Sequence, residues 1–335
     1  MHLIVMTEAA QGGGAPEAAL DSPSWEGLLQ RWSPLMMRLA PSWALQEDPE
    51  ALNTLAEQAW ARLVWGRALQ TPDDGRLPLE AWLVGDTSGT AWARLSPFHG
   101  LVGADRITLL PPADLQLSES ESRELFTAVH PLFDSEGVQL QWHGPTHWRV
   151  AHESLRDLPC ASRPRAEGDS VQRWQGRTPL AASRLLRRLQ NEAQMVLHEH
   201  PVNRLREERG ALAVNSLWLD HAGAATGPSD PQDGAAAQGP TTWLQAVRAT
   251  AVRPWSQAHE ALQAWVDGAL VPPTEGQSEP VLVLCGRYAA QAFTMRRLPG
   301  GWRGAIARTL RPPPRSKPLR DWLQGLDAPP SGAAP

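Results

Sequence analysis

Side chains suited to binding a small anion are concentrated between Asn191 and Asn215. Within this run, Arg206 follows Asn203 by three residues, and Asn215 lies next to an apolar stretch that begins at Val214. A guanidinium group binds phosphate or carboxylate oxygens through two parallel hydrogen bonds, and amide side chains fix the orientation of the bound group. Asn203, Arg206 and Asn215 therefore form a candidate site for a small anion or a phosphate ester. The alternative, in which Asn203 caps a turn and Arg206 pairs with a nearby glutamate, stays open.

Two histidines, His198 and His200, precede this set. Imidazole and carboxylate groups bind zinc and manganese, so both histidines could hold a metal together with Asp220 or His221. Residues two apart on a helix point to different faces, however, and a histidine near a helix C-terminus is favoured by the helix dipole and the free carbonyl groups. We therefore predict no metal site and keep His198 and His200 as candidate ligand-binding residues.

Glu192 completes the candidate ligand-binding set. A carboxyl group buried on an apolar helix face has a raised pKa and can act as a general acid or base. The more common arrangement is a solvated glutamate that pairs with a basic residue one turn earlier, here Arg188. We predict no catalytic residue in this set.

A long amphipathic helix and a following strand are predicted to position these residues. Thr178-Pro179 supplies an N-cap and a first-turn proline, and Pro201 prevents the helix from continuing. The strand is expected over residues 214–219. The helix should pack through one stripe of apolar side chains, Leu185, Leu186, Leu189, Ala193, Val196 and Leu197.

Several parts of this run recur together in a known family. They are a helix, the turn His200-Pro201-Val202-Asn203, an arginine after it, and the strand Val214-Asn215-Ser216-Leu217-Trp218. In these features the chain resembles the bacterial RpfE-type regulatory proteins, and the order of elements over about residues 80–225 is similar as well. The resemblance implies a cytoplasmic regulatory or ligand-sensing protein, which we expect to be non-catalytic.

Members of that family are often described as phosphoglycerate-mutase-like. The pattern Asn203-x2-Arg206-x3-Gly210-x4-Asn215 is similar to one in cofactor-independent mutases. Such an enzyme needs a serine or threonine nucleophile beside two divalent ions, because the metals activate the nucleophile and neutralise the transferring phosphoryl group. The second hypothesis is therefore a phosphoglycerate-mutase-like phosphoryl-transfer enzyme, and the third is a structural interaction module.

Two departures from these patterns count against the enzyme. The Asp-Gly that a mutase carries after its first strand is replaced by Met6-Thr7-Glu8, and the strand-end glycines of the RpfE-type pattern are replaced by Asp220-His221. We expect no bound cofactor, and a small phosphorylated metabolite or anion as the ligand.

The remaining patterns predict an α/β protein with a mixed sheet, packed helices and a smaller C-terminal part. Flexible or linking segments are expected at 9–23, 152–177 and 222–240, the second of them with one short helix, and the predicted domains are 1–221 and 241–330. Strands are predicted at 1–6, 81–84, 91–95, 106–110, 138–142, 147–150, 281–285 and 292–296. Helices are predicted in short pieces between Trp32 and Trp43, from Asp48-Pro49 to Gly66, from the capping box Ser118-x-x-Glu121 to a kink or end at Pro131, at 255–266 and at 319–326.

Composition limits the class of protein. The chain has 335 residues, 42% of them hydrophobic and 20% charged, with a formal net charge of -5. This is a globular composition, and the mild acidity argues against a general nucleic-acid binder. Cys160 and Cys285 show no metal-binding spacing, and no apolar run approaches the roughly 20 residues that span a bilayer. We expect a reduced cytoplasmic protein that binds neither nucleic acid nor membrane, with its protein partners unknown.

Overall fold

The structure, a computed structural model, is an α/β protein with mixed sheet topology. It describes residues 2–6, 39–175, 184–225, 250–254, 265, 280–295 and 324–328. The chain forms two compact units. Unit 1 comprises Met1–Pro49, Gln58–Val64 and Arg248–Pro335, and unit 2 comprises Glu50–Glu57 and Trp65–Val247. The segment 9–23 and the predicted helix at 255–266, except residue 265, lie outside the described residues.

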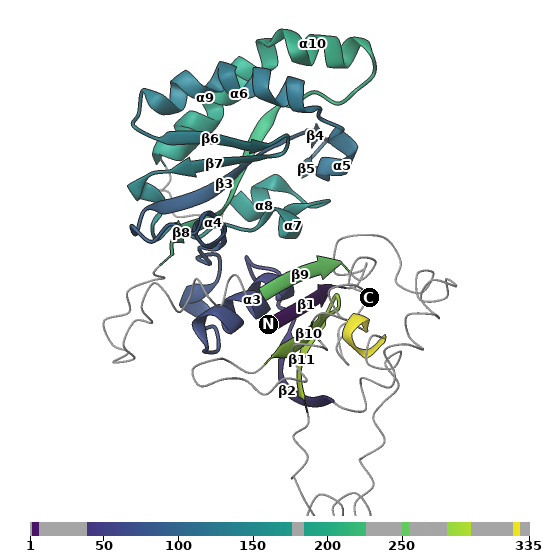
Figure 1. Cartoon of the computed structure of the whole chain (residues 1–335). Helices are drawn as coiled ribbons and strands as arrows, with labels where there is room; N and C mark the ends of the chain where they lie inside the picture. The colour runs from purple at the N-terminus through teal and green to yellow at the C-terminus, as the bar shows by residue number, and fades with distance from the viewer. Residues whose placement is uncertain are drawn as a thin grey trace, which may run out of the picture. The chain divides into compact units, whose positions relative to one another are not determined.

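Unit 1 contains a five-stranded sheet in the order β2-β11-β10-β1-β9 (Figure 1). Strand β1 lies between β10 and β9 and is parallel to both, and β11 is antiparallel to β10 and β2. Leu3, Ile4 and Val5 are buried in succession, as expected for a parallel strand covered on both faces. The strands are β1 (His2–Met6), β2 (Leu39–Gln46), β9 (Thr250–Pro254), β10 (Val281–Cys285) and β11 (Ala289–Met295).

The strand pairing of β1 changes the predicted division of the chain. The sequence places residues 1–221 in one domain and 241–330 in another, whereas β1 pairs with two strands from beyond residue 241. Parallel strands can come from segments far apart in the sequence, and a local sequence pattern does not predict such a pairing. The short helices predicted between Trp32 and Trp43 are wrong for the described part, because β2 begins at Leu39. Pro41 is tolerated there, since β2 is an edge strand and the register shifts beside it.

Helix α3 (Leu55–Trp65) begins later than Asp48-Pro49 predicts. The backbone N–H of Glu57 donates to Thr54 Oγ1 (3.3 Å), and the Thr54 N–H donates to Glu57 Oε2 (2.8 Å). This reciprocal pair is a capping box, so the helix starts after Thr54. It ends before Gly66, as predicted, where a φ of 69° suits glycine.

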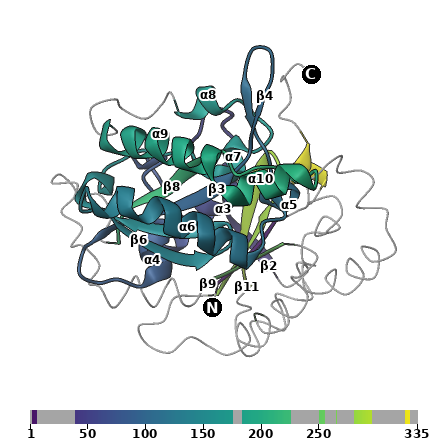
Figure 2. The same cartoon turned by 90° about the horizontal axis from the view of Figure 1, so that it is seen from above.

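Unit 2 is built on an antiparallel sheet in the order β6-β7-β3-β8. In Figures 1 and 2, helices α6 and α9 cover one face of this sheet, and α4 lies against the other. A separate two-stranded hairpin, β4–β5, projects from the unit in Figure 2. The strands are β3 (Ala91–Phe98), β4 (Gly100–Val102), β5 (Ile107–Leu109), β6 (Gln139–Gly144), β7 (His147–Ala151) and β8 (Ser216–Ala224). The helices are η2 (Thr71–Asp73), α4 (Leu79–Val84), α5 (Pro112–Leu115), α6 (Glu119–Asp134), η3 (Glu153–Leu155), α7 (Arg163–Ala166), α8 (Val171–Gln175), α9 (Arg184–Glu199) and α10 (Pro201–Glu208).

The apolar stripe predicted for the long helix is the centre of the unit 2 core. Leu186, Leu189, Ala193 and Leu197 of α9 are buried in the same cluster as apolar residues of α6 and the sheet. The capping box at Ser118 is confirmed as the start of α6. Pro131 does not end α6, because only one N–H is lost in the last turn and Ser135 N–H still donates to Pro131 O (3.1 Å).

Three local predictions for unit 2 are wrong. Residues 81–84 belong to helix α4, which ends at Gly85 with a φ of 72°; a short apolar run does not distinguish a strand from a buried helix. The predicted linker 152–177 contains η3, α7 and α8, and its apolar residues Leu155, Ala166 and Trp174 are buried. Strand β8 continues to Ala224, into the predicted linker 222–240, whose residues 226–240 lie outside the described part. No helix among the described residues is long and apolar enough to cross a membrane.

Candidate functional site

Arg206, the main candidate for binding an anion, is wholly buried in unit 2 (0% exposed). Its Nε donates to Leu212 O (2.8 Å), its Nη1 donates to Glu121 Oε2 (2.8 Å), and its Nη2 donates to Leu115 O. All three guanidinium nitrogens therefore bind the protein itself. The geometry favours the alternative in which Arg206 pairs with a glutamate and ties α10 to the start of α6.

Asn203 is used in the same way. Its Nδ2 donates to the carbonyl oxygens of Leu197 and Val214 (2.7 Å each), and its Oδ1 accepts from the Val214 N–H (2.8 Å). This buried amide joins the end of α9 to the segment that leads into β8. Asn215 pairs with a different segment, because both of its amide atoms bind the backbone of Gly100 (2.7 and 2.9 Å). The three residues thus hold separate parts of unit 2 rather than converging on one ligand.

The other predicted residues occupy helix ends and surfaces. His200 is the N-cap of α10, and its Nδ1 accepts from the Val202 N–H (3.2 Å). His198 is exposed in the last turn of α9, and Glu192 faces solvent 3.8 Å from the Nε of Arg188. Within the ranges that the structure describes, no group of three or more His, Cys, Asp or Glu side chains is placed to hold a metal ion.

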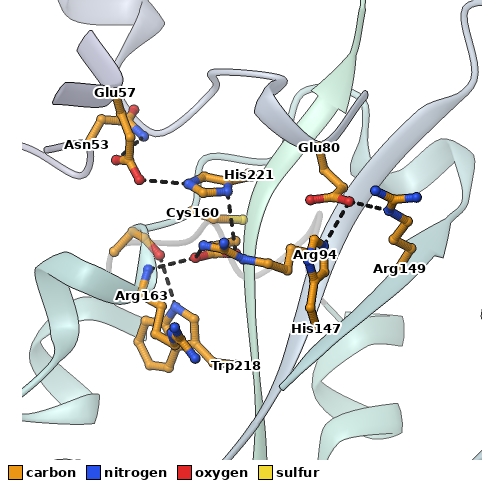
Figure 3. A network of polar contacts seen from close by, with 12 residues as sticks. Asn53, Glu57, Glu80, Arg94, His147, Arg149, Cys160, Arg163, Trp218 and His221 are labelled. Carbon is orange, nitrogen blue, oxygen red and sulfur yellow. Dashed lines mark hydrogen bonds and ion pairs between the residues drawn. The ribbon is translucent and has the colours of Figure 1, made fainter. Parts of the chain in front are cut away.

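A second polar cluster surrounds Asp220 and His221, which are 0% and 7% exposed. The Nε and Nη2 of Arg94 donate to the two oxygens of Asp220 (2.9 and 2.7 Å), and the backbone N–H of Arg163 donates to Oδ2 (2.7 Å). The His221 Nε2 lies 2.8 Å from Glu57 Oε1, and Figure 3 shows this pair beside Arg94 and Cys160. These contacts join β8, β3 and the residues around α7.

A bulge in β8 brings His221 to this cluster. Gly223 pairs with Trp92 and Asp220 with Arg94, so β8 has one more residue than β3 in this interval. His221 takes a left-handed conformation with a φ of 57°, which is uncommon for a residue with a side chain. Regular alternation would place it on the face opposite Asp220. The bulge and the left-handed conformation of His221 together place its imidazole within hydrogen-bonding distance of Glu57, at the cost of local backbone strain.

The electrostatics of this cluster favour its charged forms. Burial raises the pKa of the Asp220 carboxyl, but the charge of Arg94 and then that of His221 outweigh it, so the pKa lies well below its usual range. For Glu57, His221 likewise outweighs burial and lowers the pKa. Nearby, buried Glu80 accepts from Arg149 Nε (2.5 Å) and faces His147 Nε2 (2.9 Å). These ionic networks fix the packing around the sheet, and within them the buried His221 Nδ1 and Glu80 Oε2 have no hydrogen-bond partner.

Unit 2 contains a groove of about 500 Å³. Its lining is partly apolar and aromatic, and includes Phe98 and Trp218, whose rings meet edge to face at 6.1 Å. The lining also carries carboxamide side chains. The apolar lining residues are Phe98, Val102, Ile107, Leu158, Cys160, Ala161, Val171, Trp174, Leu186, Trp218 and Leu219, and the polar ones are Gln172, Gln175, Arg187, Gln190, Asn191, Gln194, Asn215 and Ser216.

The amides that line the groove differ in the hydrogen bonds that they make. Gln190 Nε2 donates to Leu217 O (3.0 Å), and Gln172 Oε1 accepts from the Ile107 N–H (3.3 Å). Asn191 and Gln194 are exposed, and the described part of the chain offers their side chains no hydrogen-bond partner. Asp and Glu are missing from the described lining, where Arg187 is the charged residue. The groove therefore presents hydrogen-bonding groups to whatever enters it.

Five chains of solved structures match this chain, among them the following two. A cofactor-independent phosphoglycerate mutase from Thermoplasma acidophilum DSM 1728 is 14% identical, with 98% of this chain and 99% of that chain covered at a TM-score of 0.32. The PH0037 protein from Pyrococcus horikoshii is 15% identical, with coverages of 88% and 86% and a TM-score of 0.38. No family model and no curated protein match the sequence. The RpfE-type resemblance stays a prediction.

The groove was not found from the sequence. Its signal was present in α9, where Arg187, Asn191 and Gln194 are spaced four and three residues apart and so lie on one helix face. Trp174 and Trp218, however, are 44 positions apart, and Trp174 falls in the predicted linker. No local sequence pattern indicates that the two side chains line the same groove.

Proposed function

We propose that this protein is a non-catalytic, ligand-sensing protein and that the groove of unit 2 is its ligand site. The observation that carries the proposal is the combination of an apolar and aromatic lining with two amides, Asn191 and Gln194, whose side chains have no hydrogen-bond partner in the described chain. Binding pockets of 300–1,000 Å³ with an apolar lining and a few polar groups are typical of small-molecule sites. The regulatory role is the one that the RpfE-type resemblance implies.

The polar clusters outside the groove support this choice by their geometry. The buried guanidinium of Arg206 and the Asp220–Arg94 pair use their hydrogen-bonding groups inside the protein. A ligand would have to displace these contacts, leaving buried charges unpaired at a cost of several kcal/mol. Binding to Asn191 and Gln194 in the groove requires no such displacement.

The test is a thermal-shift screen of small organic acids and phosphorylated metabolites on three forms of the full chain. Asn191→Trp fills the groove, and Met195→Trp adds the same ring to an exposed position of the same helix, outside the groove (70% exposed). We expect a ligand that raises the melting temperature of the wild type and Met195→Trp, and not that of Asn191→Trp. A shift that persists in Asn191→Trp overturns the proposed site.

A coupled assay for phosphoglycerate mutase, run with added manganese on the same preparation, tests the non-catalytic part. We expect no turnover. Metal-dependent turnover that exceeds the rate without protein would establish the mutase hypothesis instead.

A further inference from the structure

Two histidines face each other where the β6–β7 hairpin turns. The ring centres of His143 and His147 are 4.8 Å apart, and the ring planes make an angle of 74°. His143 is exposed, and the His147 side chain is 25% exposed. We propose that these two imidazoles bind a divalent transition-metal ion, with water in its remaining coordination positions. Neither histidine lines the groove, so the inference is independent of the proposed ligand site.

The hairpin holds both histidines on one face of the sheet. Trp142 precedes the first histidine and Trp148 follows the second, and both indole N–H groups donate to Ser122 Oγ of α6 (3.0 and 3.1 Å). Because successive side chains of a strand point to opposite faces, the two histidines lie on the face away from α6. The Ser122 hydroxyl also donates to Pro145 O in the turn (2.8 Å). The hairpin is thus anchored to α6, which fixes the positions of the two histidines before an ion binds.

A buried glutamate sets the tautomer of His147. Glu80 Oε1 accepts from Arg149 Nε (2.5 Å) and lies 2.9 Å from His147 Nε2 (Figure 3). In its ion pair with Arg149, Glu80 is a carboxylate, which only accepts hydrogen bonds, so the hydrogen of the neutral imidazole is on Nε2. The ring then presents the lone pair of Nδ1. Metal-binding histidines characteristically donate through one nitrogen to a carboxylate and bind the ion through the other.

The nitrogens needed for an ion are open, and the spacing of the rings suits it. Among the described residues, neither Nδ1 of His147 nor the ring nitrogens of His143 have a hydrogen-bond partner. Imidazole nitrogens bind zinc at about 2.1 Å, so two rings on one tetrahedral ion have centres about 5 Å apart. The observed 4.8 Å agrees with this distance.

The charges around the pair permit a cation. Arg149 and Arg94 lie opposite each other on β7 and β3, and unpaired arginines at this point would repel a metal ion. Each is neutralised by a buried carboxylate, Arg149 by Glu80 and Arg94 by Asp220. The second oxygen of Glu80 has no hydrogen-bond partner. The sheet face beside the histidines therefore carries no uncompensated positive charge from these two arginines.

The donor set selects the kind of ion. Imidazole suits zinc, nickel and copper, whereas calcium and magnesium take oxygen ligands. No third His, Cys, Asp or Glu joins the pair in the part of the chain that the structure describes. Structural zinc sites have four protein ligands, so an ion held by two imidazoles and water is an exchangeable one, taken up and released according to its concentration.

Calorimetric titration of the full chain with zinc chloride, and separately with nickel chloride, tests the site. We expect one ion per chain, and His143→Gln should weaken its binding at least tenfold while leaving the melting temperature without metal unchanged. His198→Gln, which alters an exposed histidine of α9, is the matched control and should leave the affinity unchanged. No saturable binding of either ion, or equal affinity of His143→Gln and the wild type, overturns the proposal.

Nitrogen-15 NMR of the imidazole rings tests the role of Glu80. Without metal, His147 should carry its hydrogen on Nε2, and added zinc should shift Nδ1 while that hydrogen stays in place. Glu80→Gln should weaken zinc binding about tenfold, whereas Glu124→Gln, at an exposed carboxylate of α6, should not. A hydrogen on Nδ1 of metal-free His147, or zinc-dependent shifts confined to other histidines, overturns the site. Equal affinity of Glu80→Gln and the wild type overturns the positioning role of Glu80.

Discussion

Arg206 and Gln194 lie on consecutive helices of unit 2 and differ in the hydrogen bonds that they make. Arg206 is enclosed and donates to Leu115, Leu212 and Glu121, whereas Gln194 is exposed in the lining of the groove, where the described part of the chain gives its side chain no hydrogen-bond partner. An asparagine and an arginine at a spacing that suits an anion can equally join two helices. The comparison shows that the hydrogen bonds a side chain already makes within the protein, rather than its residue type, distinguish a group free to bind a ligand from one that holds the fold together.

The largest effect is expected from Arg206→Ala. Removing this side chain leaves Glu121 short of a partner and buried carbonyl oxygens unsatisfied, so we expect a loss of about 3–5 kcal/mol of unfolding free energy. Urea denaturation measures it. The matched control is Arg204→Ala on the exposed face of α10, which should change stability by less than about 0.5 kcal/mol. Equal stability of the two variants would contradict the enclosed role of Arg206.

The apolar face of α9 gives the next largest effect. Leu189 is fully buried, and Leu189→Ala should cost about 2–5 kcal/mol through lost burial and the cavity that remains. Val196 is only partly buried at the edge of the core, so Val196→Ala should cost less. The two melting curves provide the comparison, and a larger loss for Val196→Ala would mean that α9 packs through a different face.

Acid should weaken the cluster that holds Arg206. Burial raises the pKa of Glu121, but hydrogen bonds from Ser118 and then from Arg209 and Arg206 outweigh it and lower the pKa from 4.5 to about 2. A carboxyl group with a lowered folded-state pKa stabilises the protein fully above pH 4.5, and that contribution disappears as the pH falls towards 2.

Stability measured from pH 6 to pH 2 checks this expectation with two variants. Glu121→Gln should be less stable than the wild type near neutrality and should lose less on acidification between pH 4.5 and 2. Glu119→Gln changes an exposed carboxylate in the same helix turn and should keep the acid-dependent loss of the wild type. An unchanged acid profile for Glu121→Gln would show that other groups govern this transition.

The smallest effect on stability is expected in the groove. Asn191→Leu and Gln194→Leu remove no hydrogen bond seen within the described chain, so each should shift unfolding free energy by no more than about 0.5 kcal/mol. Chemical denaturation of both variants and of Arg206→Ala measures the difference in unfolding free energy between the groove and the buried arginine. A loss above 1 kcal/mol would place these amides among the packing groups.

Much of the fold follows from local patterns. The capping box at Ser118, the stripe of α9 and the apolar run of β1 are set by neighbours within a few residues, and all three were predicted correctly. The wrong predictions involve short segments such as 81–84, where period alone does not separate strand from helix. The packed helices of 152–177 were missed because their burial depends on residues far along the chain.

The site was harder to predict for the same reason. Glu121 is 85 positions from Arg206, and Glu57 is 164 positions from His221. The spacing of residues along the sequence therefore does not indicate which groups pair with these side chains. The Asp220-His221 substitution was noticed as a departure from glycines. Its consequence, a bulge that directs an imidazole to a glutamate, depends on the register between β8 and β3.

The pairing of β1 also has a consequence for the order in which the chain acquires structure during synthesis. His2–Met6 is synthesised long before its partners, Thr250–Pro254 and Val281–Cys285. All strands of the β6-β7-β3-β8 sheet are made before either partner exists. The middle of the chain can thus fold co-translationally, while the apolar strand β1 stays unpaired until more than 240 further residues have been made, exposed to aggregation and to chaperones.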